Sequence, residues 1–289
     1  MNNKLTIGFI GTGVMGRSMA GHLLSAGYPV AVYNRTRSKA DDLVAQGAVW
    51  KDSPKALTEA SQVVMTIVGY PQDVESIYLG DDGIIANAAE GCLLIDMTTS
   101  SPKLAKTISE ACAAKHIHSL DAPVSGGDIG AREARLSIMV GGEETAFQRA
   151  LPLFQIMGKN IVYQGNSGSG QHTKMCNQIA IASGMMAISE AMAYAKKSGL
   201  SPETVLQSIE SGAAASWSLS HLAPRMLNND YAPGFYVKHF IKDMRIAIAS
   251  AEEMALELPG LLTAKKLYDK LAAQGLENEG TQALIKLYT

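Results

Sequence analysis

A lysine and two amides stand close together near the middle of the chain. Lys174 is followed by Asn177 and Gln178, three and four residues later. In a helix this spacing places the three side chains on one face. A lysine ammonium there could give a proton to a developing alkoxide, while the amides orient the reacting group. In isolation, the pattern fits an exposed polar first turn of a helix better than a functional site, and Cys176 between them is interpreted as a packing residue.

A second candidate for binding chemistry is the segment Asp121–Gly127, which follows a predicted strand ending at Leu120. The Ser125 hydroxyl and the N–H groups of Gly126 and Gly127 could form a small cradle for an anion such as a carboxylate. A tight loop that needs glycine for its backbone would have the same sequence. Both interpretations stay open on this segment alone.

The third candidate is a G-x-G-x-x-G motif, Gly11–Gly16, between the apolar run Leu5–Ile10 and a helical pattern. Strand, motif and helix in this order are the context of a dinucleotide-binding turn. Gly11 permits the tight turn, Gly13 lets a pyrophosphate approach the backbone, and Gly16 lets the helix pack on the strand. The pyrophosphate would then rest on the helix N-terminus. The cofactor contacts expected here come from Gly11, Thr12, Gly13, Val14, Met15 and Gly16.

The end of the second predicted strand bears on the choice of cofactor. Enzymes that use NAD carry Asp or Glu at this point to hold the ribose 2′-hydroxyl. Here Val30–Tyr33 is followed instead by Asn34, Arg35, Thr36 and Arg37. Guanidinium, amide and hydroxyl groups would hold a 2′-phosphate with charge-assisted hydrogen bonds. We therefore predict NADP(H), bound in part by Asn34, Arg35 and Thr36; a solvated arginine pair beside an NAD site is the alternative.

Strands and helices are predicted to alternate from Leu5 to about Tyr163, the pattern of parallel strands with crossover helices. The strands expected after the first two are 63–68, 92–95, 116–120, 137–140 and 161–163, with helices such as 38–46, 102–115 and 143–154 between them. The sequence therefore predicts an α/β fold with a doubly wound sheet. Its later strands could pair in mixed orientation at one edge.

A glycine-rich turn over 164–170 precedes a helical pattern of unusual length, from about Gln171 to Ser198, closed by Gly199. A helix of this length exceeds the usual globular one, which suggests that it bridges two domains. The helices expected after it are 202–211, 217–226, 237–257 and 259–274. We predict a Rossmann domain over 1–165 and an all-α C-terminal domain over 166–289, joined by the long interdomain helix.

The composition excludes several classes of function. The chain has 289 residues, 47% of them hydrophobic and 18% charged, with a net charge of −2. This charge favours neither nucleic acid nor an anionic membrane as a partner. The three cysteines include no C-x-x-C pair and the six histidines show no metal-ligand spacing, so we expect no metal, no disulfide framework and a cytoplasmic location. The apolar run Ile179–Ile188 is too short to span a bilayer.

Taken together, these segments resemble the β-hydroxyacid dehydrogenase family, which contains 3-hydroxyisobutyrate dehydrogenase and tartronate semialdehyde reductase. The resemblance covers essentially the whole chain. The first of its five motifs is weak alone, but the ordered set is highly specific. It implies an NAD(P)-dependent oxidoreductase that moves a hydride between the nicotinamide and a small β-hydroxy acid or carboxylate semialdehyde. The motifs are 11–16, 96–102, 121–127, 168–178 and Lys242-Asp243.

The resemblance also implies roles for single residues. Lys174 matches the family's catalytic lysine, and Asn177 with Gln178 matches the polar pair that positions the substrate, although some relatives carry a second Asn at the position of Gln178. The loop of Ser125, Gly126 and Gly127 matches the one that grips the substrate carboxylate.

Further positions are expected near the cofactor and the substrate. Thr99 matches a threonine near the nicotinamide, and Lys242 matches a lysine that closes over the cofactor, although Lys242-Asp243 in isolation suggests only a solvated charge pair. The segment Val68-Gly69-Tyr70-Pro71 should border the cofactor but departs from a common Leu-Pro pair, and contacts from Val68 and Gly69 are expected there. Trp217, Lys238, His239 and Phe240 should line or border the substrate pocket, with a solvated Lys238 as the alternative.

Other functions compete with this interpretation. An imine reductase shares the architecture, but the presence of Lys174 argues against it. A full-length 6-phosphogluconate dehydrogenase would need a larger second half. A non-catalytic NADP-binding regulator should have lost the lysine or the serine-glycine loop, and this chain keeps both. We therefore expect a small anionic semialdehyde, such as methylmalonate, tartronate or succinate semialdehyde, or glyoxylate, as substrate, and a homodimer or homotetramer as the assembly.

Overall fold

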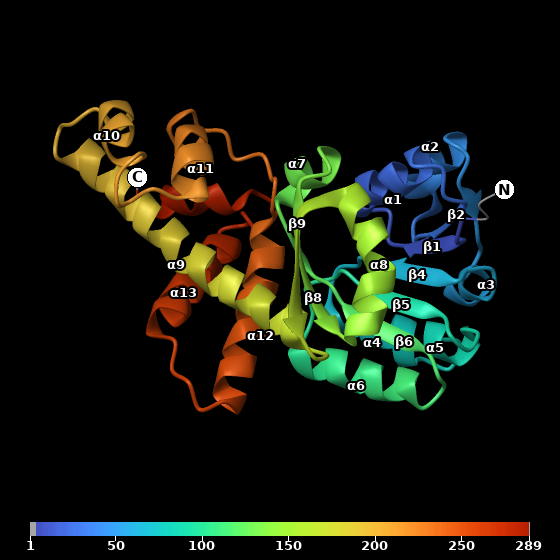
Figure 1. The fold of residues 1–289 in the computed structure, drawn as a ribbon. Coiled ribbons are helices and arrows are strands. Elements are labelled where there is room, and N and C mark those ends of the chain that lie inside the picture. The colour runs from blue at the N-terminus through green and yellow to red at the C-terminus, as the bar shows by residue number, and fades with distance from the viewer. Residues whose placement is uncertain (1–3, 289) are drawn as a thin grey trace. The chain divides into compact units, whose positions relative to one another are not determined.

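The structure is a computed structural model that describes residues 4–288. The chain divides into two compact units, one up to Lys174 and the other from Met175. The boundary lies inside one uninterrupted helix, α9 (Ser169–Lys197), which is the long helix expected from the sequence (Figure 1).

The first unit is built on a mixed sheet in the order β3-β2-β1-β4-β5-β6-β8-β7, with β9 paired to β8. Strands β1 to β6 are parallel, β8 runs antiparallel to β6 and β7, and β9 is parallel to β8. This confirms the doubly wound sheet with mixed pairing at one edge. Among the described residues its strands are β1 (Ile7–Ile10), β2 (Val30–Tyr33), β3 (Val49–Trp50), β4 (Val63–Thr66), β5 (Leu93–Asp96), β6 (His118–Asp121), β7 (Val124–Ser125), β8 (Leu136–Gly142) and β9 (Gly158–Gly165).

Helices cover both faces of this sheet (Figure 1). Alternate strand residues face opposite sides, so Ile7 and Phe9 of β1 join a core that includes Leu23, whereas Ile10 joins another that includes Leu57 and Val74. The helices of this unit are α1 (Gly16–Ser25), a 3₁₀ turn (Arg37–Ala40), α2 (Asp41–Ala45), α3 (Pro54–Glu59), α4 (Pro71–Leu79), α5 (Ile84–Asn87), α6 (Pro102–Ala113), α7 (Gly127–Arg132) and α8 (Glu144–Met157).

The order of strands reverses direction at β1, which lies between β2 and β4. In open α/β sheets this switch point, at the carboxyl ends of the strands, forms the crevice that binds ligands. The segments that follow β1, β4, β5 and β6 all leave this edge of the sheet. They contain Gly11–Gly16, Val68-Gly69, Thr99 and Ser125–Gly127, so the topology places four predicted binding segments at one edge.

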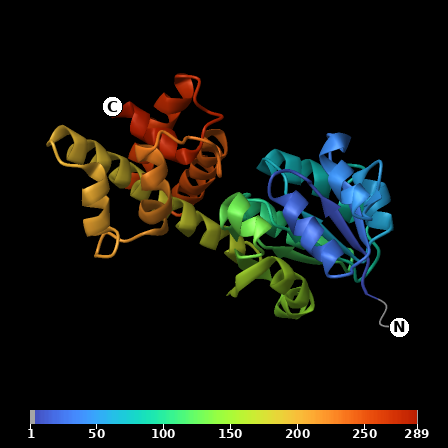
Figure 2. The same ribbon diagram turned by 90° about the horizontal axis from the view of Figure 1, so that it is seen from above.

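The second unit is helical and is built around the second half of α9, as Figure 2 shows. Met185, Ile188 and Met192 of α9 are buried together with Phe240 and Tyr268. Serine side chains begin two of the helices, since Ser201 and Ser216 accept hydrogen bonds from backbone N–H groups of the first turns. Its further helices are α10 (Pro202–Ile209), α11 (Trp217–Leu227), α12 (Val237–Glu253), α13 (Pro259–Ala273) and a 3₁₀ segment (Thr281–Leu287).

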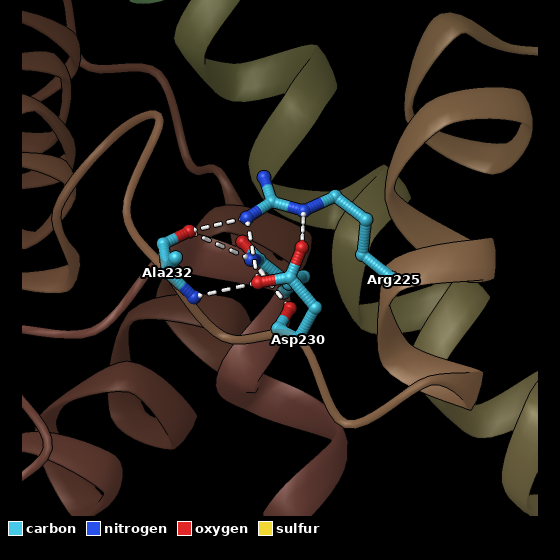
Figure 3. Close-up of polar contacts among 4 residues, drawn as sticks. Arg225, Asp230 and Ala232 are labelled. Atoms are coloured by element: carbon cyan, nitrogen blue, oxygen red, sulfur yellow. Dashed lines mark hydrogen bonds and ion pairs between the residues drawn. The ribbon is translucent and has the colours of Figure 1, made fainter.

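An arginine in α11 holds the loop that leads to α12 (Figure 3). Arg225 donates to both carboxylate oxygens of Asp230, at 2.8 and 3.1 Å, and to the carbonyl oxygen of Ala232 at 2.6 Å. Gln282 donates to the carbonyl oxygens of Asp230 and Ala232, at 3.0 and 3.1 Å. Hydrogen bonding from Arg225 lowers the pKa of Asp230. This contact fixes the loop with charge-assisted bonds rather than with apolar packing.

Candidate active site

The glycine loop after β1 leaves an open space at one of its three glycines. A side chain at Gly11 would overlap the carbonyl oxygen of Ile67, and one at Gly16 would overlap the carbonyl oxygen of Gly11. Both glycines are therefore needed by the protein's own packing. A side chain at Gly13, in contrast, would meet no atom within 4 Å. The free space lies where the sequence predicts the pyrophosphate.

Two further features of this loop fit a dinucleotide. The hydroxyl of Thr12 is buried and has no hydrogen-bond partner among the described residues. No side chain there caps the first turn of α1, whose first turn also carries no acidic residue. Free N–H groups at a helix N-terminus favour an anion. Thr12 and the open space at Gly13 therefore fit the phosphate part of a nicotinamide cofactor.

The side-chain amide of Asn34 forms hydrogen bonds with backbone groups of this loop and of the segment after β2. Its Oδ1 accepts the N–H of Thr12 at 3.1 Å, and its Nδ2 donates to the carbonyl oxygen of Thr36 at 2.8 Å. Asn34 thus joins the glycine loop to the end of β2. The adjacent Arg35 is exposed over 81% of its side chain and donates to Asp73 at 2.9 Å. It is a cation at the end of β2 that faces solvent.

The loops after β4 and β5 are joined by short polar contacts. The N–H of Val68 donates to the Thr98 hydroxyl at 3.0 Å. The buried Asp96, at the end of β5, accepts the N–H of Thr98 at 3.0 Å and the hydroxyl of Thr66 at 2.9 Å. The carboxylate therefore holds the backbone that presents Val68 and Thr99 at the carboxyl edge of the sheet.

The serine-glycine loop forms a short strand and then a helix. Ser125 belongs to β7, which pairs with β8 at Ser137. Gly126 and Gly127 both take positive φ, 133° and 62°, so glycine is required by the backbone here. The structure thus supports the tight-loop interpretation and leaves the anion cradle as a prediction.

Lys174 lies in the second turn of α9 and is buried, with 6% of its surface exposed. Lysine is almost never this buried in proteins unless it has a partner. The interpretation as an exposed polar turn is therefore wrong for Lys174. Cys176, in contrast, is exposed, which contradicts its interpretation as a packing residue.

The second unit contains a chain of polar contacts that begins three residues after Lys174. Asn177 donates to Gln178 at 2.7 Å, and Gln178 donates to Asp243 at 2.5 Å. The other oxygen of Asp243 lies 3.0 Å from the Lys242 ammonium. Only 12% of the Lys242 side chain and 2% of that of Asp243 are exposed. The interpretation of this pair as solvated charges is wrong, because α12 buries it against α9.

The remaining predicted substrate residues contact other side chains of the second unit. Lys238 donates to Asn278 at 2.7 Å and lies over the ring of Tyr236, 5.2 Å from its centre. Burial lowers the pKa of His239, and the charges of Lys242 and Lys238 lower it further. Trp217 is 58% exposed and stacks on His221 at a centre distance of 4.6 Å. The lowered pKa of His239 favours its neutral form, which can donate or accept a hydrogen bond beside the two lysines.

Sequence reasoning gave no role to four buried polar residues, Asp96, Asp121, Gln171 and Asp243, which the structure places within these networks. All four lie inside the five motifs. The available signal was a carboxylate at the last position of a buried strand, as at Asp96 and Asp121. A buried carboxylate at such a position needs hydrogen-bond donors, because burying it without them costs free energy.

Two family profiles cover nearly the whole chain. Residues 6–165 match the NAD-binding domain of 6-phosphogluconate dehydrogenase. Residues 168–288 match the profile described as NAD-binding of NADP-dependent 3-hydroxyisobutyrate dehydrogenase. The chain belongs to the β-hydroxyacid dehydrogenase family. It is therefore an NAD(P)-binding oxidoreductase of the group that contains 3-hydroxyisobutyrate dehydrogenase and tartronate semialdehyde reductase.

Individual members of the family agree with this placement. The "Uncharacterized oxidoreductase YkwC" of Bacillus subtilis is 64% identical, over 99% of both chains. The 2-hydroxy-3-oxopropionate reductase of Escherichia coli is 38% identical, over 98% of this chain and 96% of the relative. The solved structure of 3-hydroxyisobutyrate dehydrogenase from Mycobacterium tuberculosis with L-serine superposes with a TM-score of 0.91 at 30% identity, over 98% and 99% of the two chains.

None of the helices among residues 4–288 combines the length and apolar character needed to cross a bilayer. No group of three His, Cys, Asp or Glu side chains suited to a metal ion occurs in that range.

Proposed function

We propose that this family member reduces a small carboxylate semialdehyde to the β-hydroxy acid with NADPH, and catalyses the reverse oxidation. The observation that carries the proposal is the buried Lys174, in the same unit as the glycine loop and the Ser125 loop. An ammonium at this place could give its proton to a negative charge that develops on the substrate oxygen.

The residues of this chain would divide the work as follows. When bound, the nicotinamide supplies the hydride to the carbonyl carbon. The Lys174 ammonium gives its proton to the carbonyl oxygen as negative charge develops there, and takes it back in the oxidative direction. Ser125 and the N–H groups of Gly126 and Gly127 anchor the carboxylate of the substrate. Asn177, held by Gln178, orients the reacting group.

The test is the oxidation of NADPH with a panel of methylmalonate, tartronate and succinate semialdehydes and glyoxylate. We expect at least one semialdehyde to be reduced with a kcat/KM of about 10⁴ M⁻¹s⁻¹ or more, the lower end of the usual range for enzymes. Cyclic imines serve as the comparison set. Turnover of imines alone would favour the imine reductase alternative, and binding of NADPH without any turnover would favour a non-catalytic regulator.

We infer that NADP(H) is preferred over NAD(H), since Arg35 faces solvent at the end of β2 and the strand ends in an amide. The double variant Asn34→Asp/Arg35→Ala should shift the ratio of kcat/KM for the two cofactors toward NADH by about tenfold or more, the size expected for lost hydrogen bonds to a charged group. An aspartate at 34 can still accept the N–H of Thr12 but cannot donate to the carbonyl oxygen of Thr36, so the melting temperature of the variant is measured beside the rates. Both ratios are measured by initial rates.

The matched control for this prediction is Arg135→Ala. Arg135 is likewise an exposed arginine paired to an acid, Glu133, but it lies outside the predicted cofactor loops. It should leave the cofactor ratio unchanged. Equal use of both cofactors by the wild-type enzyme would contradict the inference.

We infer that the protein assembles as a homodimer or homotetramer through the exposed side of α9. Ala180, Ala187 and Tyr194 of this apolar helix are exposed, the last over 74% of its surface. Light scattering at micromolar concentration should give a dimeric or tetrameric mass, and Ala187→Glu should lower it by placing a charge in the contact. A monomeric wild-type mass would count against the assembly.

A further inference from the structure

The carboxylate of Asp121 caps the beginning of α9 from the sheet. Asp121 is the last residue of β6 and is 4% exposed. Its Oδ1 accepts the N–H of Gly168 at 2.7 Å, and its Oδ2 accepts the N–H of Gln171 at 2.8 Å. Gly168 immediately precedes α9 and Gln171 lies in its first turn, where backbone N–H groups have no partner within the helix. A residue about fifty positions earlier in the chain thus fixes the start of the helix that carries Lys174.

Gln171 holds the same turn to the loop after β5. Its Oε1 accepts the N–H of Ser100 at 2.9 Å, and its Nε2 donates to the carbonyl oxygen of Thr98 at 2.7 Å. The Gln171 side chain is fully buried. The first turn of α9 is therefore joined through one side chain to the loop that carries Thr99, and through Asp121 to the segment that leads to Ser125.

Two glycines allow the start of α9 to pack closely against the sheet. A side chain at Gly170 would overlap the carbonyl oxygens of Asp121 and Met139. A side chain at Gly141, in β8, would lie 2.6 Å from Oδ1 of Asp121 and 2.7 Å from the backbone nitrogen of Gly170. The backbone of α9 thus rests directly on β6 and β8, with no side chain between them. Such a contact leaves little freedom for the helix to shift.

We propose that Asp121 is a positioning residue, which sets the place of Lys174 relative to the Thr98–Ser100 and Ser125–Gly127 loops by holding the first turn of α9. Lys174 follows Gln171 by three residues, less than one helical turn. The role rests on the proposed function of Lys174 as proton donor. Asp121 touches neither substrate nor cofactor in this assignment. It acts through the helix.

The ionisation of the Asp121 carboxyl should make the positioning role visible in the pH dependence of kcat. Burial raises the pKa of Asp121 to about 6, even though two N–H groups donate to the carboxylate, and the charge of Asp96 in β5 raises it further. Gly141 of β8, Gly168 just before α9 and Gln171 of α9 pack against it and carry no charge. Below about pH 6 the carboxyl takes a proton, and one of its acceptor oxygens becomes a hydroxyl facing an N–H group.

The contribution of Asp121 to stability changes with pH in the direction opposite to the expected change in activity. The pKa of Asp121 is raised above its ordinary value of 3.8, so the fold favours the protonated form. Its contribution to stability is therefore fully present at low pH and declines as the pH rises through the window from about 4 to about 6. A loss of activity below pH 6 through Asp121 would then occur without any loss of stability from the same group.

The experiment compares wild type, Asp121→Asn and Ser53→Ala in NADPH-saturated reduction of the best semialdehyde. The amide at 121 keeps one acceptor but turns an N–H₂ group toward the other donor. We expect kcat to fall about 10²-fold, the usual cost of a 1 Å misplacement, with NADPH affinity unchanged. Ser53 accepts the N–H of Ala56 and caps the start of α3. Ser53→Ala therefore removes a helix cap that has no part in holding α9, and it should lower only the melting temperature.

Two readouts separate positioning from general stability. Wild-type kcat should decline below about pH 6, while Asp121→Asn should lack this decline; Lys174 cannot cause it, because the reduction needs Lys174 protonated. Hydrogen exchange followed by mass spectrometry should show faster exchange in the peptide over 166–173 for Asp121→Asn and not for Ser53→Ala. If Asp121→Asn does not fold, the wild-type profile remains a test, because a kcat that stays constant below pH 6 overturns the role.

The outcomes distinguish this proposal from the function on which it rests. An Asp121→Asn enzyme with more than half of the wild-type kcat, or with the acid decline intact, overturns the positioning role. Unchanged exchange over 166–173 also overturns it. If the wild-type enzyme reduces none of the semialdehydes, the proposed function fails, and the exchange measurement alone then shows whether Asp121 holds the helix.

Discussion

Replacing Lys174 with alanine is expected to lower kcat by about 10²-fold or more, the contribution of a general acid, while NADPH binding stays nearly unchanged. The amine is buried in the second turn of α9 and is the proposed source of the proton that reaches the carbonyl oxygen. The phosphates of the cofactor are expected to rest on the glycine loop instead. The loss should therefore fall on the chemical step, measured as kcat at saturating semialdehyde, with NADPH affinity from fluorescence titration.

Two comparison variants sharpen this result. Lys174→Arg keeps the positive charge but should also fail, because a guanidinium does not give up its proton near neutral pH. Ser125→Ala should chiefly raise KM, since it weakens the hold on the substrate carboxylate without touching the proton donor. If Lys174→Ala keeps more than about a tenth of wild-type kcat, well short of the expected loss, the proton comes from another group.

The larger elements of the fold could be predicted because their patterns are local. The strand at 30–33 was predicted at its observed bounds, and the long helix began and ended within two residues of α9. The two-residue strands β3 and β7 and the four-residue helix α5 were missed. Elements this short have no periodicity of their own. Pairing with β2 and β8 decides the two strands.

The sequence names candidate site residues, but it does not reveal their contacts. A run such as Lys242-Asp243 carries no sign that α12 will bury it, because the partner, Gln178, lies 65 residues away. The same holds for Asn34, whose amide was expected to face a phosphate and instead bonds the backbone of Thr12 and Thr36. Burial of a polar group depends on a partner brought in by the fold, and the sequence around the group does not name it.

The sharpest test of the cofactor site is a glycine variant that the protein itself should tolerate. Gly13→Ala is expected to weaken NADPH binding by about tenfold to a hundredfold, or about 1.4–2.8 kcal/mol, the usual range for inserting a methyl group into a filled site. Without cofactor, a side chain at Gly13 meets nothing within 4 Å. The melting temperature of the free protein should therefore be unchanged or slightly raised, since alanine restricts the unfolded chain.

Gly11→Ala is the matched comparison, because Gly11 has a positive φ of 98° and its added side chain would overlap the carbonyl oxygen of Ile67. That variant should lose both stability and cofactor binding, as expected when the protein's own packing is disturbed. Only a site for a ligand predicts that Gly13→Ala loses binding alone. Calorimetric titration with NADPH and thermal unfolding of the free variants measure both quantities. Wild-type affinity in Gly13→Ala would mean that the pyrophosphate does not pass over Gly13, and the open space there would then need another explanation.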